Sequence, residues 1–211
     1  MKITNHLILS AMLITLCLGT ASNAPAQDQT PPKTDAGKPT SELLGDLKKS
    51  TETAADPEVK SLGKDLGAKV GTLNTSLAGN TAAQGQLNSA LGGLTGKASP
   101  ITALSSLQQL SQAKLTPDQT KLAKDVYNTG SAYVVQKHLG NVEGAQGDVA
   151  TVVGALKKGS PSEALPALKN IGQNGKLTDS QKALVESMIK SHVPGLQKGE
   201  DFLNKIPGIG K

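Results

Sequence analysis

Leucines recur at three- and four-residue spacing along most of the chain from Thr40 onward. In the middle of the sequence, Leu104, Leu107 and Leu110 stand three positions apart. This spacing places apolar side chains on one face of a helix and the polar residues between them on the other. Runs of β-branched and aromatic residues, which are typical of strands, are scarce, and the best candidate is the short run at 133–135. The pattern predicts an all-α domain.

Helix-start signals flank these apolar stripes. Ser99, Thr116 and Ser160 each precede a proline, and Thr178 precedes an acidic residue. A hydroxyl side chain at this position accepts hydrogen bonds from free backbone N–H groups, and proline is tolerated in the first turn. A Gln or Glu three positions after the last three of these caps predicts capping boxes. We therefore expect all four residues to cap helices, with Pro166 breaking the helix after Ser160 or delaying it by a turn.

The caps and stripes recur with a period of about sixty residues. LGKDL at 62–66 matches LAKDV at 122–126, and QGQLNSALGGL from Gln84 matches QGDVATVVGAL from Gln146. Repeated units of this kind bury their apolar faces against their neighbours. We predict three units, each with a short helix, a longer helix and a third helix, which either stack as a solenoid or pack as one bundle. The predicted units are 40–98, 99–159 and 160–211.

Three glycines in the first predicted unit, Gly63, Gly67 and Gly71, stand four positions apart. On a helix they form one row, where the missing side chains let another backbone come close. Within a membrane this spacing mediates helix association, but no run of spanning length lies in this region, so we expect close packing in a soluble bundle. At the corresponding positions the second unit has Ala123, Tyr127 and Ser131.

The beginning of the chain differs from the rest. Lys2 precedes an apolar run at 7–19, and an A-x-A triplet ends at Ala26. These features are typical of a secretory signal peptide, so we predict that residues 1–26 are cleaved off near Ala26. The alternative, a retained anchor, would need about 20 apolar residues. Residues 27–39 carry three prolines and no aliphatic side chain larger than alanine, and are predicted to be a disordered linker.

Cysteine and aromatic residues limit the available chemistry. Cys17 is the only cysteine and lies in the predicted signal peptide, where we interpret it as an apolar residue. A lipid-modified cysteine would follow a small residue, whereas Leu16 precedes this one. After cleavage the chain would have no disulfide, catalytic thiol or cysteine-ligated zinc. Only Tyr127, Tyr133 and Phe202 are aromatic, so aliphatic side chains must form the core.

The basic residues point to few partners. All 22 are lysines, and they are interspersed with 17 acidic residues. Arginine forks that bind phosphate and guanine are missing, and aromatic platforms that stack bases are scarce. We expect no nucleic-acid partner. Lysines beside apolar residues at 151–159 and 204–211 leave an anionic membrane surface as an alternative partner, although Phe202 is the only large anchor.

The sequence lacks the patterns that mark catalytic, cofactor and metal sites. After the predicted cleavage only His138 and His192 remain, and they are not spaced as a helical ligand pair. The glycine-rich stretch at 140–148 lacks the ending of a phosphate-binding loop, and no G-x-S-x-G occurs. Asp65 and Asp125 each follow a lysine, which we interpret as an exposed charged pair. We expect no enzyme, no cofactor and no metal site.

These observations lead to one leading hypothesis and one alternative. The first is an exported, non-catalytic helical protein, periplasmic or secreted, with a binding or structural role in the cell envelope or outside the cell. Its partner is an unidentified protein or envelope component. The second is a peripheral protein that lies on anionic envelope surfaces through lysine-rich amphipathic helices.

Overall fold

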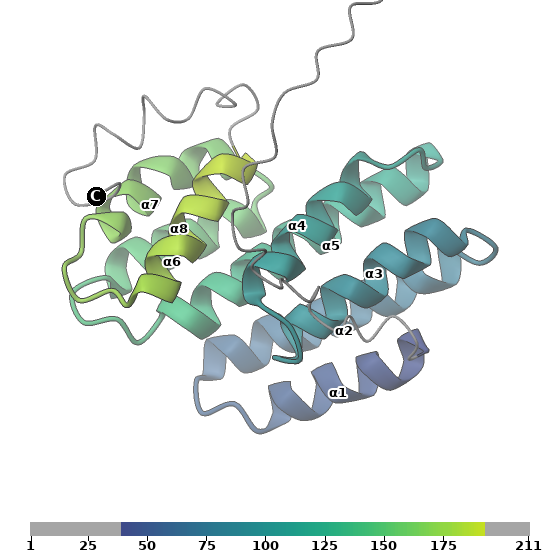
Figure 1. Cartoon of the computed structure of the whole chain (residues 1–211), viewed down its shortest axis with the longest axis horizontal. Coiled ribbons are helices and arrows are strands. Elements are labelled where there is room, and N and C mark those ends of the chain that lie inside the picture. The colour runs from purple at the N-terminus through teal and green to yellow at the C-terminus, as the bar shows by residue number, and fades with distance from the viewer. Residues whose placement is uncertain (1–38, 193–211) are drawn as a thin grey trace, which may run out of the picture. The chain divides into compact units, whose positions relative to one another are not determined.

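The computed structural model describes residues 39–192, and this part of the chain is all-helical, as predicted (Figure 1). It belongs to the second of the two units into which backbone contacts divide the chain, Pro32–Lys211. The predicted signal peptide, the linker up to residue 38 and the last part of the third predicted unit, 193–211, lie outside the described residues. The helices are α1 (Thr40–Glu52), α2 (Pro57–Ser76), α3 (Thr81–Leu94), α4 (Pro100–Gln112), α5 (Pro117–Leu139), α6 (Gln146–Lys157), the 3₁₀ helix η1 (Pro161–Ala164), α7 (Leu165–Gly172) and α8 (Asp179–His192).

Three of the four predicted cap residues accept hydrogen bonds at helix starts. The Ser99 hydroxyl accepts from the backbone N–H two residues later, at 3.2 Å. Thr116 and Gln119 form a capping box, with side-chain to backbone bonds of 3.3 and 3.1 Å in the two directions. Thr178 and Gln181 form the same reciprocal pair, at 3.3 and 2.9 Å. Each cap satisfies N–H groups that have no partner within the helix.

Ser160 does not act as predicted. Its side chain makes no cap hydrogen bond, and the chain continues as the 3₁₀ helix η1 before α7 begins at Leu165. The cause is Pro166, which lacks an N–H and whose ring would clash with the carbonyl group four residues earlier in an α-helix. The tighter 3₁₀ turn, in which the Glu163 N–H donates to the Ser160 carbonyl at 2.9 Å, accommodates the residues before the proline.

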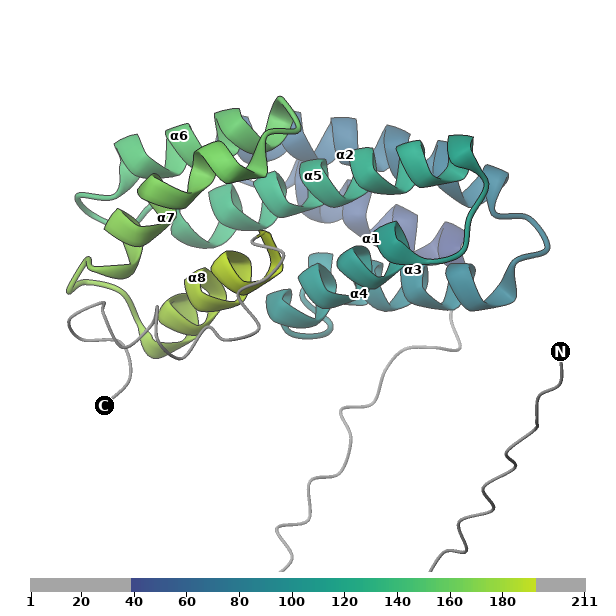
Figure 2. The same cartoon turned by 90° about the horizontal axis from the view of Figure 1, so that it is seen from above.

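The core is built almost entirely from aliphatic side chains. Leu104, Leu107 and Leu110 of the predicted stripe have no exposed surface. Tyr133 is also fully buried, and Tyr127 is 8% exposed. Among neighbouring helices, α3 packs beside α4 and α2 packs beside α5 (Figures 1 and 2). The longest helix, α5, also packs against α4 and α6, so it occupies the centre of the described bundle.

Two equivalent hydrogen bonds tie the long helices together. The amide of Gln119, in the first turn of α5, donates to the carbonyl of Ser76 at the end of α2, at 2.5 Å. The amide of Gln181, in the first turn of α8, donates to the carbonyl of His138 at the end of α5, at 2.8 Å. In each case the start of one helix meets the end of another. Because α2 and α5 also pack side by side, these two helices run antiparallel.

Candidate binding groove

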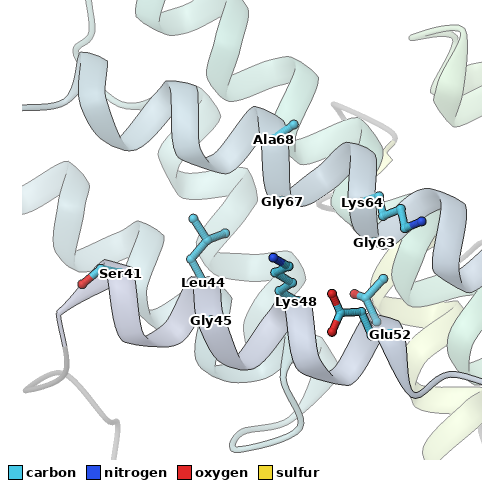
Figure 3. A pocket seen from close by; sticks show the side chains of 10 residues that line it. Ser41, Leu44, Gly45, Lys48, Glu52, Gly63, Lys64, Gly67 and Ala68 are labelled. Carbon is cyan, nitrogen blue, oxygen red and sulfur yellow. The ribbon is translucent and has the colours of Figure 1, made fainter.

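An exposed groove runs between α1 and α2, and we call it the α1/α2 groove. Its volume is about 570 Å³, and Figure 3 shows the lining side chains on the two facing helices. Every lining residue comes from α1 or α2. The groove is lined by Ser41, Leu44, Gly45, Lys48, Thr51, Glu52, Gly63, Lys64, Gly67 and Ala68.

The three glycines that the sequence singled out play different parts here. A Cβ atom added at Gly63 would lie 2.3 Å from the Thr51 hydroxyl, so α1 and α2 are in direct contact at this point. At Gly67 and Gly71 the nearest atoms to such a Cβ are methyl groups of Leu44, at 4.0 and 3.9 Å. The helices therefore separate along the row, because contact at Gly63 is not continued at Gly67. Two of the row's glycines, Gly63 and Gly67, line the groove.

The groove combines an apolar floor with charged rims. Leu44 and Gly67 are half-buried, while Lys48, Glu52 and Lys64 are exposed. An apolar side chain of a ligand would cover Leu44 and the α2 backbone, and an acidic or carbonyl oxygen could accept a hydrogen bond from either lysine. The arrangement suits the binding of a partly apolar, partly polar surface.

A second depression, between α5 and α6, offers less. Its volume is about 670 Å³, and its rim includes Glu58 and Lys157. These two side chains form an ion pair at 3.2 Å. Two of the three charged residues that line this depression thus pair with each other, with Lys158 as the third, and we take the α1/α2 groove as the better candidate for a ligand.

Tyr127 is a structural residue whose contacts the sequence did not predict. Its hydroxyl donates to the carbonyl of Ser191, near the end of α8, at 3.5 Å. Burial raises the pKa of Tyr127 to about 12. The other tyrosine, Tyr133, lies beneath the Lys137 ammonium, which is 5.3 Å from its ring centre and donates to the Leu94 carbonyl at 3.1 Å. Tyr127 thus connects α5 to α8, and Lys137 connects α5 to α3.

The two histidines considered for chemistry belong to different helices. His138 is half-buried in the last turn of α5; burial, and next the charge of Lys137, lower its pKa. His192 is the last residue of α8. Within residues 39–192 no three His, Cys, Asp or Glu residues are grouped so that they could hold a metal ion.

The charged pair predicted for Asp65 with the adjacent lysine was wrong. Asp65 pairs with Lys69 instead, at 2.8 Å. Neighbouring residues on a helix point in different directions, whereas residues four apart lie on the same face. Lys69 also donates to the Thr129 hydroxyl of α5, at 2.8 Å, so this pair helps to join α2 and α5.

The sequence singled out two residues on the α2 side of the groove, Gly63 and Gly67, but as a close helix contact, and it indicated none of the α1 residues below. The missed residues are Ser41, Gly45, Lys48 and Glu52, which share one face of α1. Their spacing of three and four positions is the signal that could have located them. It went unnoticed because only Gly45 departs from an ordinary exposed helix face.

No protein-family model matches this chain. No curated protein and no solved structure matches it either. In the described range, none of the helices has both the length and the apolar character needed to cross a membrane.

Proposed function

We propose that this is an exported, non-catalytic helical protein that acts by binding a partner in the cell envelope or outside the cell, or as a structural component there. The observation that carries the proposal is the α1/α2 groove, an exposed apolar floor between two helices with lysines on its rim. The apolar run before Ala26 supports export by cleavage of residues 1–26.

We further propose that the chain is built from three repeated units, beginning near residues 40, 99 and 160. The matching hydrogen bonds from Gln119 to Ser76 and from Gln181 to His138 support this division. Helix lengths support it as well, since α1 and α4 have 13 residues each and are followed by the longer α2 and α5. The third helix of each unit has different neighbours: α3 packs on α1 and α4, whereas α6 packs on α5 and α7.

Export is tested by the mass and location of the protein in cells that make it. We expect the chain outside the cytoplasm with a mass corresponding to a first residue at Gln27. A full-length chain retained in the cytoplasm would contradict export.

Binding is tested by photo-crosslinking in the same intact cells. A photoreactive amino acid at Lys48, on the groove rim, is expected to capture a defined partner. The same amino acid at Lys121, which is exposed in the second turn of α5, serves as the control. Equal capture at both positions, or none at Lys48, would count against the groove as the binding surface.

The membrane-surface alternative is tested with vesicles. Co-sedimentation with anionic vesicles that disappears at high salt would favour a peripheral membrane protein, since salt screens attraction between exposed charges. Absence of binding at low salt leaves the protein-binding function.

A further inference from the structure

The helix pairs α1/α2 and α4/α5 correspond position by position. α1 and α4 are both 13 residues long, and α2 and α5 both begin at a proline. Each position of the first pair therefore matches the position 60 residues later in the second. By this match Ser41, Gly45 and Lys48 of the groove correspond to Ile101, Ser105 and Gln108, and Gly67 corresponds to Tyr127.

On the second pair, α8 lies beside the corresponding surface and leaves an open space along part of it. Ile101, Ser105 and Gln108 line a space whose other wall belongs to α8. The Gln108 amide donates to the Ser191 carbonyl at 3.2 Å, and the Tyr127 hydroxyl donates to the same oxygen at 3.5 Å. The last turn of an amphipathic helix is thus held by two donors of the α4/α5 pair.

On the first pair no other described helix lines this surface, and a lysine there favours a ligand with negative charge. Gly67 stands where Tyr127 fills the second pair, and Lys48 stands where Gln108 donates. The C-terminal turn of a helix carries carbonyl groups without partners and a partial negative charge. An exposed lysine therefore suits that turn at least as well as the glutamine does.

We propose that the α1/α2 groove binds an amphipathic helix of another protein, with the C-terminal turn of that helix against Lys48 and Lys64. The helix resembles α8, whose buried face consists of Leu184, Val185, Met188 and Ile189. Each copy of this chain already holds its own α8 on the α4/α5 pair, so a second copy supplies no free described helix of this kind. The inference rests on the proposed binding function and names the class of partner.

The probe is a synthetic peptide with the sequence TDSQKALVESMIKSH, that of residues 178–192. It is titrated into the full-length ¹⁵N-labelled protein up to millimolar concentration, and amide chemical shifts are recorded. We expect saturable shifts of the Gly63, Gly67 and Gly71 amides. Shifts confined to α4 and α5, which would mean exchange with the protein's own α8, or no shifts at all, would overturn the proposal.

Two variants test the geometry. Gly67→Tyr places in the groove the side chain that fills the second pair, and we expect at least a tenfold weaker affinity. Gly85→Tyr, at an exposed helical glycine of α3 with open space around it, is the matched control and should bind like the original. Lys48→Glu, at an exposed position that cannot disturb the core, should weaken binding at least fivefold. Unchanged affinity in both groove variants would overturn the proposal.

Two further measurements separate the outcomes. Light scattering without peptide detects self-association, and a dimer that Gly67→Tyr abolishes would assign the groove to a second copy and overturn the partner helix. If photo-crosslinking at Lys48 captures a partner but the peptide fails to bind, the helix inference falls while the binding function stands. If the peptide binds but no partner is captured in cells, the groove recognises helices and the proposed cellular function falls.

Discussion

The helix pairs α1/α2 and α4/α5 start alike and end differently. Both pairs join a 13-residue helix to a longer one that begins at a proline. In the second pair, Ala123, Tyr127 and Ser131 are all buried, and α8 lies against the pair. In the first, Gly67 and Gly71 at the matching positions remain half-exposed. At the position that Tyr127 and Gly67 share, the second pair contacts the end of α8, whereas the first pair lines the α1/α2 groove.

The hydrogen bonds at the helix ends are alike in the two regions, although the surfaces of the helix pairs differ. The bond from Gln119 to Ser76 and the bond from Gln181 to His138 are alike although the surfaces beside them differ. Capping depends on a few backbone atoms at helix ends, whereas packing depends on every side chain along the helix. The ends of the helices therefore keep a common plan while their faces diverge.

The largest expected effect on stability comes from removing the Tyr127 side chain from the α4/α5 pair. Tyr127→Ala removes a buried aromatic ring and should lower the free energy of unfolding by about 3–5 kcal/mol, as measured by urea denaturation. Amide hydrogen exchange in α8 should become faster. Tyr127→Phe, which removes only the bond to the Ser191 carbonyl, should cost about 1 kcal/mol or less. Similar costs for both variants would show that the ring does not hold α8.

A smaller effect separates two glycines of the same row. Gly63→Ala places a methyl group 2.3 Å from the Thr51 hydroxyl and should destabilise the protein by about 1–3 kcal/mol. Gly67→Ala has no atom nearer than 4.0 Å and should stabilise it by up to about 1 kcal/mol, because alanine is the better helix former. Thermal unfolding of the two variants gives both signs. Destabilisation by both would mean that the groove is not open at Gly67, and stabilisation by both would mean that α1 and α2 are not in contact at Gly63.

Two matched substitutions test whether the hydrogen bonds at the two helix ends are equivalent. Gln119→Ala and Gln181→Ala each remove one bond between long helices and one half of a capping box. Each should cost about 1 kcal/mol of unfolding free energy. Values that differ by more than about 1 kcal/mol would break the correspondence between the two junctions.

The smallest effect is a pH dependence of the stability, and it is expected only where α8 meets the end of α5, at His138. Burial lowers the pKa of His138 below its ordinary value of 6.5, so the unfolded chain binds a proton more readily than the folded one. The stability from neutral His138 is present above pH 6.5 and is lost as the pH falls from there toward the folded pKa, by at most about 1.4 kcal/mol per pH unit.

Urea midpoints between pH 7.5 and 5.5 measure this loss. His138→Gln should flatten the profile over that range. The pKa of Asp56 is lowered from 3.8, first by its hydrogen bond with Gln136, so Asp56 contributes its own loss only at more acid pH. An unchanged slope in the His138 variant would assign the pH dependence to another group.

Local patterns predicted most of the helices. Ser99, Thr116 and Thr178 stand at helix starts, and the leucines of α4 are buried as their spacing indicated. These features depend on residues within a turn or two, which the sequence displays directly. The two local errors have local causes as well, since Pro166 excludes an α-helix after Ser160 and helix geometry pairs Asp65 with Lys69.

By itself, the sequence determined where helices begin, which faces are apolar and that the core is aliphatic. Only the tertiary structure decided that Tyr127 meets the end of α8 and that the matching glycine lines an open groove. A contact between residues 64 positions apart depends on how whole helices pack, and equal helix patterns are compatible with different packing. A glycine row permits close approach, and the side chains on the facing helix decide whether it occurs.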